Sequence, residues 1–116
     1  TLDGAPSRMP SLDSVRLIHI HQDQVVAVPQ DATLIGSTSF CTNAMFHMGD
    51  NVFCMQGHPE FTPDYTAALM ETRRERMGED RVDHALHTLK DDHEGVDIAR
   101  WIATFFRQHA QNRAAA

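Results

Sequence analysis

Basic residues are scarce in this chain, and lysine is almost absent. Its 116 residues include 10 Lys and Arg against 16 Asp and Glu, so the formal net charge is −6. Lys90 is the only lysine, and the one basic cluster, at residues 73–76, is short and is explained as the solvated end of a helix. A nucleic-acid-binding surface and a polybasic membrane patch both depend on clustered positive charge, so neither is expected.

Long apolar runs and cysteines are also few. No apolar run is long enough to span a bilayer. The N-terminus lacks the basic and apolar segments of a secretory signal. Two cysteines, Cys41 and Cys54, offer no disulfide framework. These absences predict a cytoplasmic location, and a hydrophobic fraction of 41% is sufficient for one packed domain.

The first half of the chain has the pattern of a loop followed by short strands. Residues 1–14 are rich in Gly, Pro, Ser and Asp, which predicts a loop or frayed start. Short apolar segments separated by turn residues follow, and Gly49-Asp50-Asn51 predicts a hairpin. The five predicted strands cover residues 15–21, 25–29, 33–38, 44–48 and 52–55.

The last predicted strand, at residues 52–55, is apolar at every position. A strand with one solvated face would alternate, so this one is expected to be central in its sheet. It runs directly into the polar, turn-prone stretch at residues 56–61. Ligands and catalytic groups often lie beyond the carboxyl ends of strands, so this loop is a candidate site.

The second half predicts three helices. Thr62 as N-cap, Pro63 at the first position and Gly78 as a stop define one, with Tyr65 and Met70 on its apolar face. A second begins near Asp80. The third follows Gly95, with an apolar stripe of Ile98, Ile102, Phe105 and Phe106 next to Trp101, and residues 114–116 form a tail.

An order of strands followed by helices is unusual for a complete α/β domain, because no helix lies between the strands to cover the sheet. Residues 15–113 are therefore expected to be the C-terminal half of a larger domain, produced by proteolysis, truncation or gene structure. Such a half should pair with its missing part or with a second copy of itself.

His58-Pro59-Glu60 is the most informative stretch. A carboxylate two residues from an imidazole can accept a hydrogen bond from one ring nitrogen and leave the other free to take a proton. His58 and Glu60 would then be two members of a nucleophile–base–orienter triad. The alternative is a surface turn that contains these residues without chemistry.

The stretch at residues 55–61 resembles the signature that closes the active site of class I (triad-type) glutamine amidotransferases. Residues 21–25, Pro29 and residues 32–37 resemble the preceding stretch in the GMP-synthase-like members, and Phe46 and Gly49 match later landmarks. The resemblance implies an α/β, flavodoxin-like, doubly wound fold, with a mixed sheet and hairpin strands followed by helices. It also implies hydrolysis of glutamine, or of a related γ-glutamyl amide, with no metal or organic cofactor.

The resemblance further implies roles for five residues. His58 would be the general base and acid, and Glu60 would orient it. His21, Gln22 and Asp23 would line the glutamine pocket, although Ile20 stands where relatives often have serine. A strand-end turn is the alternative explanation for His21 and Asp23.

The nucleophile of that family is missing from this chain. Relatives place a cysteine on a strained G-x-C-x-G elbow, and no such motif occurs here. Cys41 has no flanking glycine, and Cys54 lies within an apolar strand, so both are predicted to be packing residues. This chain alone is therefore expected to be inactive, with the cysteine supplied by a missing N-terminal half.

Two other possibilities remain open from the sequence, and the favoured interpretation implies one more partner. The chain could be a non-catalytic amidotransferase scaffold that binds a partner. His19 and His21, with Asp23 or His58, could form a metal site, and His84 and His87 have ligand-like spacing. In the intact protein, a synthetase domain or subunit would use the ammonia.

Overall fold

The computed structural model of this protein describes residues 13–115. Residues 1–12 and 116, which include most of the predicted N-terminal loop and the last residue of the predicted tail, lie outside the described residues. The order of strands followed by helices agrees with the sequence prediction. The elements are β1 (Ala32–Gly36), β2 (Met45–Met48), β3 (Val52–Met55), α1 (Pro63–Thr72), α2 (Arg74–Met77), α3 (Glu79–Thr88) and α4 (Gly95–Ala115).

The three strands form one antiparallel sheet in the order β1-β2-β3. The predicted hairpin is confirmed, with Met45 opposite Met55 and Met48 opposite Val52. Gly49 in the turn has a φ of 52°, a left-handed conformation that glycine adopts without a steric cost. The parallel strands of a mixed sheet are not found within residues 13–115.

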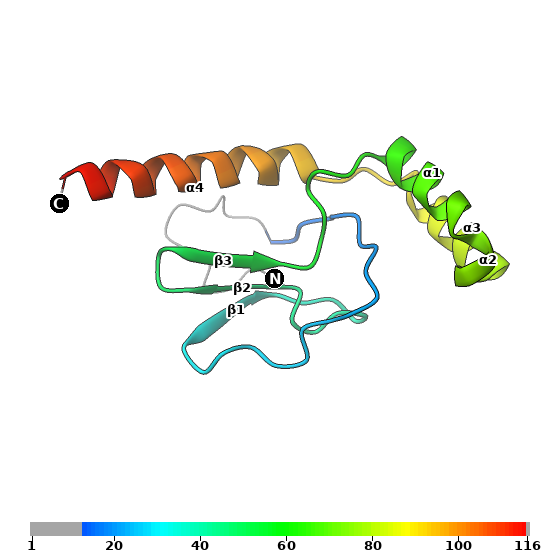
Figure 1. The fold of residues 1–116 in the computed structure, drawn as a ribbon, viewed down its shortest axis with the longest axis horizontal. Helices are drawn as coiled ribbons and strands as arrows, with labels where there is room; N and C mark the ends of the chain where they lie inside the picture. The colour runs from blue at the N-terminus through cyan, green and yellow to red at the C-terminus, as the bar shows by residue number, and fades with distance from the viewer. Residues whose placement is uncertain (1–12, 116) are drawn as a thin grey trace.

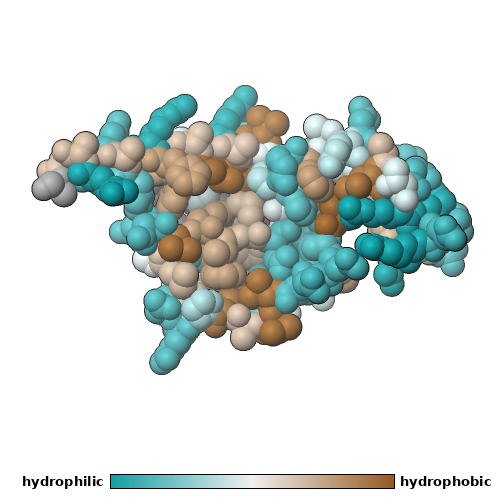
Figure 2. Space-filling model, viewed as in Figure 1, coloured by the Kyte–Doolittle hydropathy of each residue, from teal (hydrophilic) through white to brown (hydrophobic). Residues whose placement is uncertain are grey.

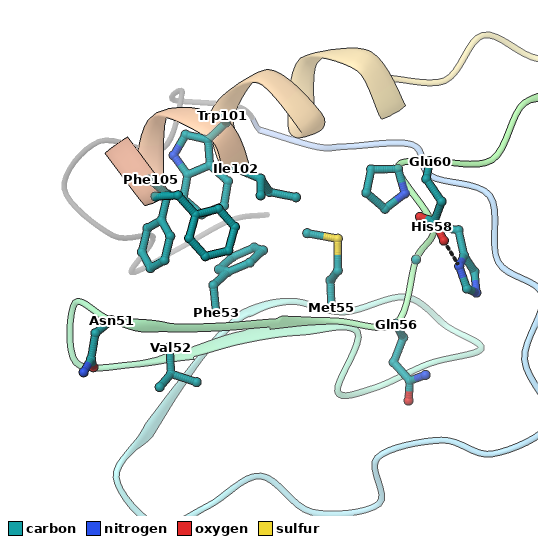
Figure 3. A pocket seen from close by; sticks show the side chains of 13 residues that line it. Asn51, Val52, Phe53, Met55, Gln56, His58, Glu60, Trp101, Ile102 and Phe105 are labelled. Carbon is teal, nitrogen blue, oxygen red and sulfur yellow. Dashed lines mark hydrogen bonds and ion pairs between the residues drawn. The ribbon is translucent and has the colours of Figure 1, made fainter. Parts of the chain in front are cut away.

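The predicted central position of β3 is wrong for the described sheet, because β2 is central and β3 is an edge strand. The two faces of a strand and its two hydrogen-bonding edges are separate properties. Phe53 and Met55 point toward α4, whereas Val52 points to the opposite face (Figure 3). The unbroken apolar pattern of β3 therefore reports packing on both faces and gives no information about edge pairing.

Two predicted strands do not form. Residues 15–21 contain only a single bridge, between Ile18 and His58. Residues 25–29 have no strand pairing, because side chains satisfy the backbone of Val25. Its N–H donates to Gln56 Oε1 and its carbonyl accepts from Asn43 Nδ2, both at 2.8 Å. The apolar pattern of residues 25–29 correctly predicted an extended segment. It did not predict that the backbone of this segment would bind side chains in place of a neighbouring strand.

The predicted helix starts agree with α1, α3 and α4, but the first predicted helix is interrupted and α4 continues to Ala115, into the predicted tail at 114–116. Thr62 caps α1 by accepting from the N–H of Tyr65, and Pro63 follows at its first position. The helix breaks at Arg73 (φ −113°, ψ 6°), so α2 is a separate short turn that ends at Gly78 (φ 92°). Arg74 contacts carboxylates of Glu71, Glu79 and Asp83, each at 2.7 Å.

Helix α4 packs against the sheet, while α1, α2 and α3 form a cluster beyond the end of β3 (Figure 1). The main core consists of Ile35, Met45, Ile98 and Trp101. Tyr65 and Phe106, both predicted on apolar helix faces, are 53% and 65% exposed. No helix within the described range is both long and apolar enough to cross a bilayer.

Candidate functional site

The turn that follows β3 is held by three different segments. The N–H of Gln56 donates to Ala44 O, and the N–H of His58 donates to Ile18 O, both at 2.8 Å. Gly95, the first residue of α4, packs so tightly that a Cβ there would lie 2.6 Å from Pro59 O. The backbone of the turn is therefore fixed by contacts that are distant in sequence.

Within this turn, His58 and Glu60 form a direct hydrogen bond. His58 Nδ1 lies 2.8 Å from Glu60 Oε1, and the two side chains are 30% and 60% exposed. Because a carboxylate only accepts, Nδ1 carries the proton, and Nε2 of the neutral ring is left as an acceptor. The ring also stacks on Phe61, with centroids 4.2 Å apart and planes 5° apart.

The ionised form of Glu60 is favoured by this arrangement. Burial acts to raise the pKa of Glu60, but three effects outweigh it: the hydrogen bond from His58, a bond from its own backbone and the charge of the imidazole. The net pKa is below the ordinary value of 4.5. Glu60 is therefore a carboxylate that accepts from His58 at neutral pH.

A groove of about 510 Å³ lies between β3 and α4, and the His58–Glu60 turn closes one end of it (Figure 3). The rings of Phe53 and Trp101, which both line the groove, contact each other edge-to-face with centroids 4.5 Å apart. Figure 2 shows the apolar surface between α4 and the sheet. The main apolar lining residues are Val52, Phe53, Met55, Trp101, Ile102, Phe105 and Phe106.

The second predicted group, His21, Gln22 and Asp23, lies on the extended segment beyond the Ile18–His58 bridge. His21 Nδ1 is 3.0 Å from the backbone carbonyl of Asp23, and the Gln22 and Asp23 side chains are exposed. Within residues 13–115, no hydrogen bond or ring contact joins any of the three to His58 directly. His19 lies between the groups: its Nδ1 is 3.3 Å from His21 Nε2.

His19 is also close to the His58 turn. A Cβ on Gly57 would lie 3.1 Å from His19 Nε2. Burial, followed by the charges of His21 and His58, lowers the pKa of His19 below its ordinary 6.5. His19 is therefore neutral at neutral pH, and it lies between His21 and Gly57.

Neither cysteine has the surroundings of an activated nucleophile. Cys41 is completely buried, in a tight turn where its N–H donates to Thr38 Oγ1. Cys54 lies within β3, opposite Phe46. Both thiols are free. A nucleophilic cysteine needs access to substrate and a partner that stabilises its thiolate, and these positions offer packing instead.

The metal alternative lacks a complete set of ligands. Across residues 13–115, no group of three or more His, Cys, Asp or Glu side chains could hold a metal ion. His84 and His87 are both exposed on α3. A third ligand for His19 and His21 is thus missing from the described part of the chain.

Comparison with known proteins gives similarity over part of the chain. A stretch of 58 residues is 40% identical to gamma-glutamyl peptidase 3 of Arabidopsis thaliana, covering 50% of this chain and 23% of that relative. Gamma-glutamyl peptidase 4 of the same plant is 39% identical over 51 residues, which cover 44% of this chain and 20% of that relative. A putative glutamine amidotransferase-like protein of Schizosaccharomyces pombe is 26% identical over 94 residues, which cover 76% of this chain and 38% of that relative.

Two of these relatives are named gamma-glutamyl peptidase and one is named glutamine amidotransferase-like. The chain spans less than two-fifths of the length of each of these three relatives. No family model matches the chain. No solved structure matches it.

Sequence reasoning overlooked two features of this site. Phe61 follows His58 by three residues, and the turn brings its ring flat against the imidazole. An aromatic residue beside a candidate base is a signal that could have been read from the sequence. The sequence pattern indicates His19 only as a metal ligand, and its position next to Gly57 depends on the Ile18–His58 bridge.

Proposed function

We propose that this chain supplies the general base, His58, and its orienting carboxylate, Glu60, to a class I glutamine amidotransferase site. The hydrogen bond of 2.8 Å between them carries the proposal. It gives His58 the tautomer that a triad base requires, with Nε2 unprotonated and Nδ1–H bound to a carboxylate. The partial similarity to amidotransferase-like proteins supports the same chemistry.

The proposed reaction proceeds in two steps. A cysteine thiol loses its proton to His58 Nε2, its sulfur attacks the side-chain carbonyl of glutamine, and the C–N bond breaks. His58 returns the proton to the departing nitrogen, so ammonia leaves and a glutamyl thioester remains. His58 then takes a proton from water, whose oxygen attacks the thioester carbonyl. The C–S bond breaks, the departing sulfur takes that proton from His58, and glutamate is released. These steps use side chains alone.

We place the cysteine on a segment outside these 116 residues. The G-x-C-x-G motif is absent from the sequence, and Cys41 is completely buried. The open edge of β3 and the adjoining apolar groove are suited to further strands of a doubly wound, flavodoxin-like sheet. A strand parallel to β3 would end beside His58, because parallel strands share the edge where their carboxyl ends meet.

Two leaving groups are compatible with the proposed reaction. The amide of glutamine and a γ-glutamyl peptide present the same acyl group and differ only in the amine that departs. Similarity to proteins named gamma-glutamyl peptidase makes a γ-glutamyl peptide the second candidate substrate. A synthetase domain or subunit that uses the ammonia is implied only for glutamine.

We also propose a cytoplasmic location, with which the two free thiols agree.

Ammonia release from glutamine tests this proposal. The chain is assayed alone and as part of a longer product that contains a glycine-flanked cysteine, with γ-glutamyl peptides assayed in parallel. We expect no activity from the chain alone. In the longer product, Glu60→Gln should lower kcat by about 100-fold or more, because the amide no longer fixes the His58 tautomer.

Glu75→Gln is the matched control, since Glu75 is an exposed glutamate on α2 away from the turn. It should leave kcat unchanged. Activity of the chain alone that disappears with Cys41→Ser or Cys54→Ser would contradict the external nucleophile. A longer product that folds but turns over neither substrate would favour a non-catalytic scaffold.

A further inference from the structure

His19 lies between His21 and the glycine that precedes His58. Its Nδ1 is 3.3 Å from His21 Nε2, on the segment predicted to bind substrate. Its other ring nitrogen lies against Gly57, next to the proposed base His58. A single imidazole therefore links two parts of the site that are far apart in sequence.

Hydrogen-bond direction determines the tautomer of His21. Its Nδ1 is 3.0 Å from the Asp23 carbonyl, and a carbonyl oxygen can only accept. His21 Nδ1 must therefore carry a proton. In the neutral ring, Nε2 is then a lone-pair acceptor.

The same reasoning extends to His19. Because His21 Nε2 accepts, His19 Nδ1 must donate across the distance of 3.3 Å. Its ring is neutral near pH 7, since burial and the neighbouring imidazoles lower its pKa. His19 Nε2 is consequently unprotonated and faces Gly57. The hydrogen bonds run in one direction, from His19 to His21 to the Asp23 carbonyl.

Packing on the other side of His19 is close. A Cβ at Gly57 would lie 3.1 Å from His19 Nε2, and 2.8 Å and 2.9 Å from two carbons of Leu17. Between these residues, Ile18 accepts the N–H of His58 at 2.8 Å. Residues 17–19 thus hold the backbone of Gly57 and His58 in place by packing and by one hydrogen bond.

We propose that His19 is a positioning residue of the proposed amidotransferase site, which fixes the ring of His21 through its Nδ1–H and supports the Gly57–His58 backbone with the rest of its ring. The inference rests on the proposed function for its role in substrate binding. Its structural content, the tautomers of two histidines, does not depend on turnover.

Long-range proton–nitrogen NMR spectra of the 116-residue chain test it directly. At a pH of about 8, above the ordinary pKa of histidine, His19 and His21 should both be protonated at Nδ1 alone. His19→Asn keeps an N–H donor close to the position of Nδ1, and His21 should keep its tautomer. His19→Leu keeps bulk and removes the donor, so His21 should shift toward the Nε2-protonated form.

Wild-type rings protonated at Nε2 would overturn the proposal without any variant. An unchanged His21 tautomer in a folded His19→Leu chain would also overturn it, as would the same tautomer change in His19→Asn. In an active longer product, His19→Leu should raise KM for glutamine about tenfold and leave kcat within about twofold, with His19→Asn restoring KM. A folded longer product without turnover would reject the proposed function, while the tautomers still decide the structural claim.

Discussion

His58 Nδ1 lies 2.8 Å from Glu60 Oε1, although only Pro59 separates the two residues in the chain. Such a short loop can form this bond from local geometry alone. The placement of the pair is a different matter. His58 is bound through its backbone to Ile18, and Gly95 packs against Pro59. The pair is therefore local in origin but is positioned by two distant segments.

Replacing His58 with Gln should raise the pKa of Glu60 toward 4.5, because the bond that most opposes burial is weakened. A folded-state pKa below the unfolded value means that this interaction stabilises the fold fully above about pH 4.5. That contribution is lost as the pH falls through the lower, folded-state pKa. Carbon NMR titration of the Glu60 carboxyl group measures the shift.

Glu71 provides the internal control for this titration. Its pKa is also lowered, chiefly by the hydrogen bond from Arg74, which lies outside the site. The pKa of Glu71 should stay low in His58→Gln and rise in Arg74→Met. The pKa of Glu60 should rise in His58→Gln and stay low in Arg74→Met. Glu60 titrating identically in the wild type and His58→Gln would refute the assigned cause.

Substituting Gly57 with Ala should destabilise the fold and displace His58. The new Cβ would lie 2.8 Å from Leu17 Cβ, which is backbone-attached and cannot swing away. Overpacking of this kind typically costs about 1–3 kcal/mol. Urea unfolding gives the free energy, and the amide resonance of His58 reports its displacement.

Gly78→Ala separates packing from backbone strain. Gly78 has a φ of 92°, and a Cβ added there would have no atom within 4 Å. The cost of this substitution therefore comes from the backbone and is about 1 kcal/mol. The His58 amide should not move in this variant. Equal shifts of that amide in both variants would show that Gly57 does not act through local contact.

Trp101→Ala should cost about 3–5 kcal/mol, because Trp101 is only 5% exposed and belongs to the main core. Its edge-to-face contact with Phe53 should add a coupling of about 0.5–1.5 kcal/mol in a double-mutant cycle with Phe53→Ala. Urea unfolding of the wild type, the two single variants and the double variant measures the cost and the coupling.

Val96→Ala is the control on the same helix, at a position 61% exposed, and it should change the free energy of unfolding by less than about 0.5 kcal/mol. Additive effects at Trp101 and Phe53 would contradict the contact.

The sequence was most informative where the determining interactions are local. Thr62 and Pro63 predicted the start of α1, and Gly49 predicted the hairpin turn. It was least informative about strand pairing. The segment at residues 25–29 is extended, but its backbone binds the side chains of Gln56 and Asn43, and no local pattern specifies such partners.

By itself, therefore, the sequence determined where α1, α3 and α4 begin, the hairpin and the proximity of His58 to Glu60, since each depends on residues a few positions apart. Only the tertiary structure decided that β3 is an edge strand, that Ile18 holds the His58 backbone, and that His19 lies between the two predicted groups. The last two features require segments about 40 residues apart to meet. Their contacts are fixed by packing and by backbone hydrogen bonds, which leave no periodic signal in the sequence.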